Sequence, residues 1–206
     1  MEASGWSCDH GPRGGAYALF LDVERCVGCE ACVVACMDQN DLEVERKEHA
    51  WRRVFPLELG TPGELGTPRE LGTPREPGTP REPGARSPAA LVFVSLACMH
   101  CGDAPCLPAC PTGALGRAAA TGAVVVEQER CIGCHSCALA CPFGAPRYGP
   151  DGRMHKCDLC TARVEHGLDP ACVHTCPTRA LRFGRVNDLT DHVQARAAAR
   201  LARAAG

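Results

Sequence analysis

The sequence predicts an α+β fold assembled from small cysteine-rich modules, and three observations lead to that prediction. Cysteines account for seventeen of the 206 residues, whereas aromatic residues account for only 4%. Sixteen of the cysteines fall into four groups of four with recurring spacing. Short apolar segments lead into these groups, and short helical segments lie within them. Because a chain with so few large apolar side chains builds only a small core, we expect bound metal to stabilise it.

Three apolar segments are predicted to form strands, because they are β-branched or aromatic and are bounded by glycine, proline or charged residues. They span residues 16–22, 91–96 and 123–127. Short helices are expected within the cysteine groups, at residues 30–40, 104–110, 136–141 and 170–176. A last helix is predicted at residues 187–206, where Asn187 or Asp188 can cap it. It is expected to pack through one apolar face, formed by Leu189, Val193, Ala197 and Leu201.

A hexapeptide repeat interrupts the chain between the first and second cysteine groups. Residues 58–88 repeat the pattern Glu-Leu-Gly-Thr-Pro-Arg with small variations. Glycine and proline in every unit disfavour both helix and strand, and the repeat offers almost no apolar side chains to bury. We therefore expect a disordered surface insertion that takes no part in the core.

The spacing of the cysteines is typical of iron-sulfur proteins. Two groups share the pattern C-x2-C-x2-C-x3-C, and they are Cys26, Cys29, Cys32 and Cys36, and Cys131, Cys134, Cys137 and Cys141. The other two lengthen the second gap to four and eleven residues, and they are Cys98, Cys101, Cys106 and Cys110, and Cys157, Cys160, Cys172 and Cys176. In bacterial ferredoxins three close thiolates of such a run hold one [4Fe-4S] cluster, and the fourth binds a different cluster. Four triads and four outlying cysteines would then make four sites of four thiolates each.

The residues beside the cysteines indicate four different environments. Gly28 and Gly133 precede the second cysteine of their groups, where a missing Cβ lets backbone N–H groups approach a cluster. His100 and Leu159 take the same place in the other two groups. Met37 follows the outlying cysteine of the first group. In the other groups a proline follows, which turns the chain away after the ligand, at Pro111, Pro142 and Pro177.

Zinc and disulfides are the alternatives for cysteines at this density. A zinc site needs four thiolates in two pairs and gives no reason for a third cysteine three residues after the second. Disulfide frameworks belong mainly to small secreted chains, and residues 1–13 contain no apolar signal segment. A zinc-stabilised interaction module without redox activity therefore stays as a remote alternative. Cys8 lies outside every group and is expected to be a free thiol.

The remaining sequence offers no residues for other kinds of chemistry. A net charge of -2 gives no basic excess that would favour nucleic acid. Without a nucleotide-binding glycine loop or a hydrolytic triad, we expect no catalytic residues and a chain that moves electrons. The longest apolar run, residues 89–98, is too short to cross a bilayer. Arg52 and Arg53 are interpreted as an ordinary surface pair.

Three cysteine-rich stretches resemble the iron-sulfur B subunits of dimethyl sulfoxide reductase-type molybdopterin oxidoreductases. They are CVGCEACVVACMDQND from Cys26, CMHCGDAPCLPACPTGAL from Cys98 and CIGCHSCALACPFGAPRYGPDGRMHKCDLCTARVEHGLDPACVHTCPTRALRFG from Cys131 to Gly184. The resemblance implies four [4Fe-4S] clusters in two bacterial-type 2x[4Fe-4S] ferredoxin-like modules that are nested in sequence. Residues 1–57 would form a first half-module that the fourth cysteine group, at residues 150–186, completes. Residues 89–149 would form the second module.

The resemblance also implies which cysteines share a cluster, whereas sequence distance alone permits several pairings. We call the four implied ligand sets sites 1 to 4. Site 1 comprises Cys26, Cys29, Cys32 and Cys176, and site 2 comprises Cys36, Cys157, Cys160 and Cys172. Site 3 comprises Cys98, Cys101, Cys106 and Cys141, and site 4 comprises Cys110, Cys131, Cys134 and Cys137.

Two partners follow from the resemblance, namely a molybdopterin-containing catalytic subunit and an integral membrane anchor subunit that exchanges electrons with quinone. The chain itself is expected to have no membrane span and no nucleic-acid partner. It would be membrane-associated through its partners, either on the cytoplasmic side or exported with a signal-bearing partner. The alternative is a polyferredoxin-type carrier for a formate dehydrogenase or hydrogenase complex.

Overall fold

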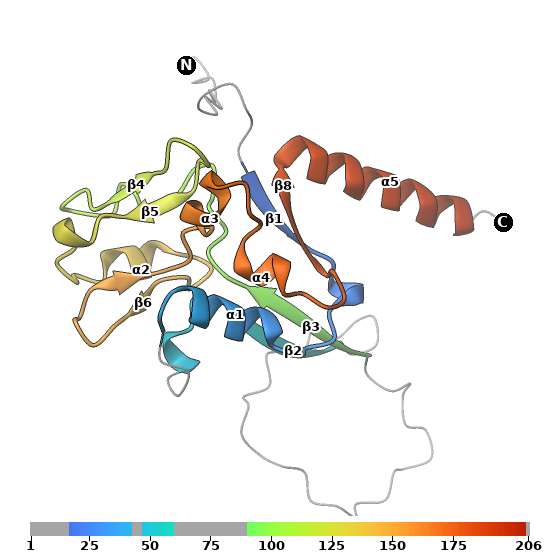
Figure 1. The fold of residues 1–206 in the computed structure, drawn as a ribbon, viewed down its shortest axis with the longest axis horizontal. Coiled ribbons are helices and arrows are strands. Elements are labelled where there is room, and N and C mark those ends of the chain that lie inside the picture. Colours follow the sequence, from blue (N-terminus) through green and yellow to red (C-terminus); the bar gives the residue numbers. More distant parts are fainter. Residues whose placement is uncertain (1–16, 43–46, 60–89, 205–206) are drawn as a thin grey trace, which may run out of the picture.

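The computed structural model describes residues 17–42, 47–59 and 90–204, and the elements given below lie in these ranges (Figure 1). The strands are β1 (Tyr17–Leu21), β2 (Arg53–Leu59), β3 (Ala90–Leu96), β4 (Leu115–Arg117), β5 (Val124–Val126), β6 (Arg147–Tyr148), β7 (Met154–His155) and β8 (Leu181–Arg185). The α-helices are α1 (Ala31–Gln39), α2 (Ser136–Ala140), α3 (Thr161–Glu165), α4 (Ala171–His174) and α5 (Val186–Ala204). Short 3-10 helices are η1 (Val23–Arg25), η2 (Lys47–His49) and η3 (Gln128–Arg130).

Within these ranges the strands form small antiparallel sheets of two strands each. β4 pairs with β5 and β6 pairs with β7, so these are local hairpins. β1 instead pairs with β8, from Tyr17 opposite Arg185 to Leu21 opposite Leu181. A strand near the start of the chain therefore lies beside one near its end (Figure 1). This pairing brings the first cysteine group close to the fourth.

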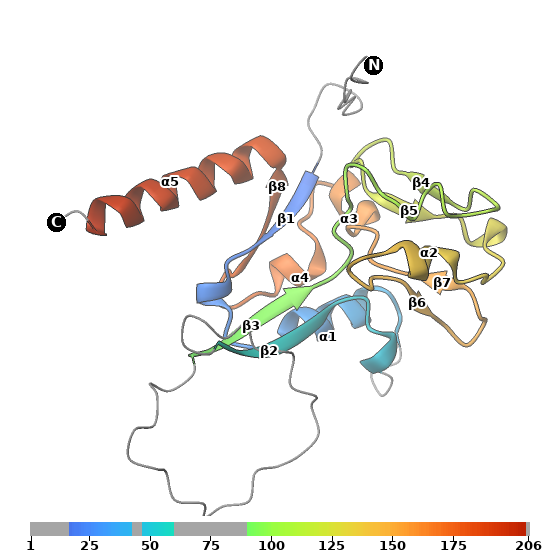
Figure 2. The ribbon, with the colours of Figure 1, turned by 180° about the vertical axis from the view of Figure 1, so that it is seen from behind.

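Two small apolar clusters form the core, and both contain cysteines. The buried members of the first are Cys32, Val33, Met37, Ala50, Cys172 and Leu181, which join α1 to α4 and β8. The buried members of the second are Ala104, Leu115, Val124, Cys137 and Met154. The hairpins β4–β5 and β6–β7 lie with α2 to one side of α1, α4 and the β2–β3 pair (Figures 1 and 2).

The strands β2 and β3 flank the hexapeptide repeat and pair with each other from Arg53 opposite Leu96 to Leu59 opposite Ala90. The last described residue before residues 60–89 and the first one after them therefore pair with each other at one end of the strand pair. β2 was not predicted, and its last residues, Glu58 and Leu59, were expected in the insertion. Residues 60–89, which contain the rest of the insertion, lie outside the described residues.

Most of the predicted elements are confirmed. β1, β3 and β5 form at the predicted strands, and α1, α2 and α4 form within the predicted helices. Within residues 104–110, predicted as a helix, residues 105–109 form consecutive turns instead. Pro108 explains the difference, because it has no backbone N–H to donate to the Ala104 carbonyl four residues earlier.

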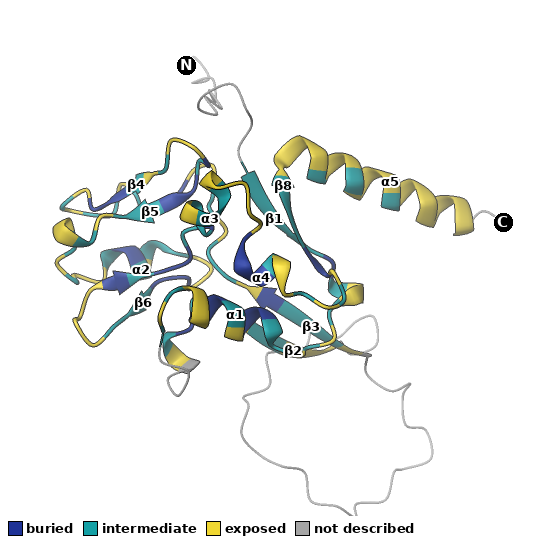
Figure 3. Cartoon of the chain, viewed as in Figure 1, coloured by how far each residue is buried: buried dark blue, intermediate teal, exposed yellow. Residues whose placement is uncertain are grey.

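The C-terminal helix α5 is confirmed, but its apolar face is not packed as expected. It projects along one side of β8 and is mostly exposed (Figure 3). Val193 is 43% exposed and Leu201 is 73% exposed. Charged contacts hold the helix to the N-terminal region, since Arg196 pairs with Asp22 at 2.5 Å and Arg200 pairs with Glu24. None of the helices in the described ranges is both long and apolar enough to cross a membrane.

Candidate iron-sulfur sites

The four cysteines expected at site 1 line one cavity, and they are Cys26, Cys29, Cys32 and Cys176. Cys26 directly follows η1, and Cys32 lies in the first turn of α1. Cys176 arrives from the other end of the chain, shortly after α4. The contact between α1 and α4 and the β1–β8 pair bring these segments together. Cys29 is exposed, so this cavity lies near the surface.

A second cavity is lined by the four cysteines expected at site 2, namely Cys36, Cys157, Cys160 and Cys172. Cys36 lies one turn after Cys32 in α1, and Cys172 lies in α4. Burial raises the pKa of Cys157 to about 12, and it also raises the pKa of Cys36. Both groups are therefore neutral thiols until a metal binds, and cluster assembly must release their protons.

Arg52 also lines the cavity of site 2. Its interpretation as a surface residue is wrong, because Arg52 is only 2% exposed. Its Nη1 donates a hydrogen bond to Ser95 Oγ at 3.0 Å. Ser95 belongs to β3, on the far side of the insertion, so sequence reasoning had no signal for this contact. Arg53, the next residue, is exposed as expected.

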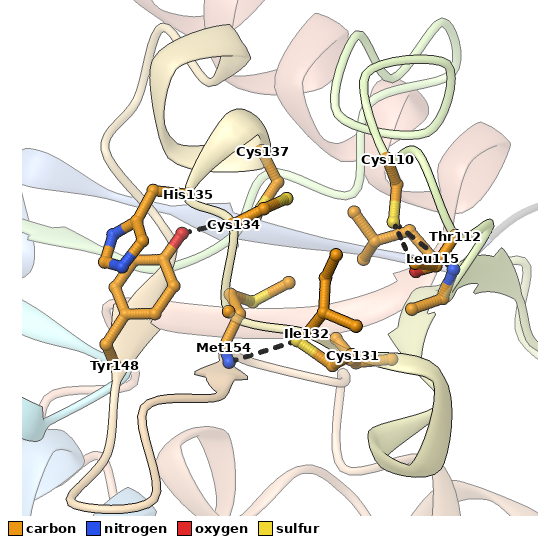
Figure 4. A pocket seen from close by; sticks show the side chains of 13 residues that line it. Cys110, Thr112, Leu115, Cys131, Ile132, Cys134, His135, Cys137, Tyr148 and Met154 are labelled. Atoms are coloured by element: carbon orange, nitrogen blue, oxygen red, sulfur yellow. Dashed lines mark hydrogen bonds between the residues drawn. The ribbon is translucent and has the colours of Figure 1, made fainter.

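A third cavity is lined by the cysteines expected at site 4, which are Cys110, Cys131, Cys134 and Cys137. Cys110 reaches toward it from one side (Figure 4). The loop before α2 supplies Cys131 and Cys134, and α2 itself supplies Cys137. The Met154 N–H donates to Cys131 Sγ at 3.4 Å. Cys134 is exposed, so site 4 lies near the surface as site 1 does.

Tyr148 supplies a further polar contact at site 4. Its hydroxyl lies 3.5 Å from Cys137 Sγ, and its ring stacks on His135 at 3.9 Å (Figure 4). Burial and the neighbouring Cys137 raise the pKa of Tyr148. The hydroxyl therefore keeps its proton and can donate it to the sulfur. Sequence reasoning missed this residue, because Tyr148 reaches the site only through the β6–β7 hairpin.

Three of the four cysteines expected at site 3 lie near one another, and they are Cys98, Cys106 and Cys141. Cys101 and Cys106 pack against the second apolar cluster. Burial raises the pKa of Cys106, and the nearby thiols of Cys98 and Cys141 raise it further while Lys156 lowers it. Cys141 thus lies near the second group although it belongs to the third. Ligation at this and the other three sites stays a prediction that these placements support.

The residue before the second cysteine has the same left-handed backbone in all four groups. The φ values are +70° at Gly28, +46° at His100, +66° at Gly133 and +66° at Leu159. His100 and Leu159 adopt this conformation with a Cβ, but packing requires the two glycines. A Cβ at Gly28 would lie 2.4 Å from the Phe93 ring, and one at Gly133 would lie 2.4 Å from the Gly152 oxygen.

The three outlying cysteines that precede proline share a loop that folds back on its own sulfur. The third residue after each is left-handed, with φ of +59° at Gly113, +58° at Gly144 and +51° at Arg179. The next residue then aims its N–H at the sulfur. Ala114 donates to Cys110 Sγ at 3.3 Å, and Ala145 donates to Cys141 Sγ at 3.5 Å. The alanine recurs in the sequence after all three prolines, and this was an available signal for the loop.

Comparison with known proteins places the chain among iron-sulfur proteins. Two family models, each described as a 4Fe-4S dicluster domain, match residues 25–114 and 89–186. The probable anaerobic dimethyl sulfoxide reductase chain YnfG of Escherichia coli strain K12 is 37% identical over 84% of this chain and 75% of its own length. The B subunit of the anaerobic dimethyl sulfoxide reductase of the same strain has the same identity and coverage. The chain belongs to the iron-sulfur B-subunit family of dimethyl sulfoxide reductase-type oxidoreductases.

The B-subunit family extends to dehydrogenases. The iron-sulfur subunit of the nitrate-inducible formate dehydrogenase of Escherichia coli strain K12 is 35% identical to this chain. That match covers 88% of this chain and 58% of the formate dehydrogenase subunit. The dicluster models and the grouped cysteines together support [4Fe-4S] clusters as the cofactors of this B-subunit chain.

The thiols of this B subunit fit an iron-sulfur cluster in their chemistry and in their surroundings. Each of the three cavities is lined by thiols from two different cysteine groups. Backbone N–H groups point at several of the sulfurs, including one from Leu159 to Cys157 Sγ at 3.4 Å. Such hydrogen bonds stabilise thiolate ligands and help to set the potential of a cluster. In the ranges that the structure describes, no three His, Cys, Asp or Glu side chains converge as for a single metal ion.

Proposed function

We propose that this chain is a non-catalytic electron-transfer subunit with four [4Fe-4S] clusters, one at each of sites 1 to 4. It would relay electrons between a molybdopterin-containing catalytic subunit and a membrane anchor subunit that exchanges electrons with quinone. The observation that carries the proposal is the cavity geometry. Three cavities are each lined by four thiols, and each combines a triad with the outlying cysteine of another group.

The nested arrangement of the modules is part of this proposal. The first and fourth cysteine groups would form one module, supported by the β1–β8 pair and the contact between α1 and α4. The second and third groups would form the other module, supported by the cavity that Cys110 and Cys131 share. In this arrangement α1 carries ligands of both site 1 and site 2, since Cys32 and Cys36 are one turn apart.

The proposed path runs through the molecule from one exposed site to another. When bound, [4Fe-4S] clusters supply one-electron transfer without bond rearrangement of a substrate. Cys29 at site 1 and Cys134 at site 4 are exposed, whereas Cys157 and Cys172 at site 2 are buried. Electrons would therefore enter and leave at sites 1 and 4. The protein residues hold the thiols in place and exclude water from the middle of the path.

The partners and the location are proposed from the relatives. YnfG and the B subunit from the same strain are both named as components of anaerobic dimethyl sulfoxide reductases. By analogy this chain would be membrane-associated through its partner subunits. The second candidate, a carrier for a formate dehydrogenase complex, is favoured by the formate dehydrogenase relative. Both candidates require the same clusters and differ in the catalytic subunit.

The test is anaerobic reconstitution followed by co-purification. We expect about sixteen iron and sixteen acid-labile sulfide per chain, because each of four clusters contains four of both. A value near eight would leave one module empty, and a colourless zinc-loaded protein would overturn the proposal. Co-expression with the neighbouring genes then identifies the partner. Recovery of a molybdopterin-containing reductase subunit with an apolar anchor subunit is expected, and recovery of a formate dehydrogenase or hydrogenase subunit would exclude the first assignment.

A further inference from the structure

Arg52 is a buried cation between two of the cysteine sets. Its guanidinium lines the cavity of site 2 together with Cys36, Cys157 and Cys172. On its other side it donates to Ser95 Oγ at 3.0 Å. Ser95 Oγ in turn lies 3.4 Å from Cys32 Sγ, a ligand expected at site 1. Arg52 therefore reaches site 2 directly and site 1 through one hydroxyl.

The charge of Arg52 faces sulfur. Burial opposes the charge, but the surrounding thiols of Cys172 and Cys157 raise the pKa of Arg52 above its ordinary value. Among the residues that the structure describes, no carboxylate forms an ion pair with Arg52. A guanidinium stays protonated in proteins, so this charge is fixed.

Lys156 is a second buried cation, next to the site 2 cysteine Cys157. It is 4% exposed, and its Nζ donates to the Cys157 carbonyl oxygen at 2.9 Å. It also donates to the carbonyl oxygen of Val124 in β5. Val124 belongs to the apolar cluster against which Cys101 and Cys106 of site 3 pack. Lys156 therefore lies between site 2 and site 3.

We propose that Arg52 and Lys156 are the counter-charges of the site 2 cluster, with Arg52 shared with site 1 and Lys156 shared with site 3. This inference rests on the proposed function, because it requires clusters at these sites. Reduction adds one negative charge to a cluster, and a buried cation nearby favours the reduced form. Site 2 has two such cations nearby, so its potential is raised more than the potentials of its neighbours. The pair makes the most buried step of the path accessible to an electron.

The test is a redox titration of the reconstituted full-length chain, followed by electron paramagnetic resonance. Arg52→Gln should lower two of the four midpoint potentials, and Lys156→Met should also lower two. One potential, that of site 2, should fall in both variants. We expect at least a tenfold loss in the equilibrium constant for its reduction, which is about 59 mV for one electron.

Matched controls test whether the shift in potential requires a buried charge or follows from the loss of any nearby charge. Arg53→Gln removes the exposed arginine next to Arg52, and Arg153→Gln removes an exposed arginine three residues before Lys156. Neither should move any potential by a comparable amount, because water and salt screen exposed charges. Equal shifts in a variant and its control would overturn the inference.

Arg52→Lys distinguishes the effect of the charge from the effect of the side-chain shape, because it keeps the positive charge and changes the shape. It should hold the same iron as the unmodified chain and keep the raised potentials, even if Arg52→Gln binds less iron. The inference fails if Arg52→Lys and Arg52→Gln lose iron or potential equally, or if no potential is shared between the two sets of variants. Failure of the proposed function is distinguishable, because the unmodified chain would then lack the expected iron.

Discussion

At the scale of single residues, the cysteine loops have one backbone geometry with different side chains. The position before the second cysteine is left-handed whether it holds glycine, as at Gly28 and Gly133, or a larger residue, as at His100 and Leu159. A left-handed conformation costs about 1–2 kcal/mol for a residue with a Cβ. The turn is therefore set by the need to direct two nearby thiols to one cavity. Glycine occurs where a neighbouring group also excludes a Cβ.

Gly133→Ala tests that explanation. The alanine would have to keep the positive φ, and its Cβ would lie 2.4 Å from the backbone oxygen of Gly152. We therefore expect a loss of about 2–4 kcal/mol in stability. Gly144→Ala is the matched control, because its φ is also positive but no atom lies within 4 Å of the new Cβ. It should lose only about 1 kcal/mol. Anaerobic urea unfolding of both loaded variants makes the comparison, and equal losses would exclude the steric contribution.

Cys176→Ala tests the ligand sets. The variant should lose the same cluster as Cys29→Ala, and iron should fall from about sixteen toward twelve per chain. The double variant should lose no more iron than either single variant, because both cysteines serve site 1. Cys160→Ala should lose a different resonance signal, and Cys8→Ala should keep all the iron. A matching loss in Cys176→Ala and Cys160→Ala would instead place Cys176 on the triad of its own group.

At the scale of elements, the sequence predicts what depends on neighbouring residues. Apolar runs and glycine boundaries were sufficient to predict the strands β1, β3 and β5. They were insufficient to predict β8, because its partner strand β1 lies near the other end of the chain. The cysteine triads could be read from spacing, and the pairing of the groups came from the family resemblance. The burial of Arg52 could not be predicted, because its partner Ser95 lies beyond the insertion.

The hexapeptide insertion should be removable without loss of clusters. Leu59 and Ala90 face each other as the last pair of β2 and β3, so an Asn-Gly turn can replace residues 60–89 and close a hairpin. We expect the shortened protein to bind the same iron and to unfold at the same temperature or slightly higher. Replacing residues 60–89 with a glycine-serine segment of equal length is the control for chain length. A loss of iron in the shortened protein alone would indicate that the length of the insertion matters to the fold.

At the scale of the whole molecule, the core includes several of the expected ligands. Cys32 and Cys172 belong to the first apolar cluster, and Cys137 belongs to the second. The largest fully buried side chains include Met37, Met154 and Leu159, and none of them is aromatic. The segments that supply site 1 and site 2 come from both ends of the described residues. Cluster binding would therefore close the longest loops of the fold, where the entropy of closure is greatest.

Removal of iron should consequently unfold the protein rather than only bleach it. Metal-binding free energy acts as folding free energy when the site does not exist in the unfolded state. The small core provides little other folding free energy, because without the clusters the buried thiols of Cys36 and Cys157 are merely small apolar side chains. We expect an iron chelator, added anaerobically, to abolish the cooperative thermal transition measured by circular dichroism. The same chelator saturated with iron beforehand is the control and should leave the transition in place. An iron-free protein that still unfolds cooperatively would mean that the two apolar clusters suffice to fold it.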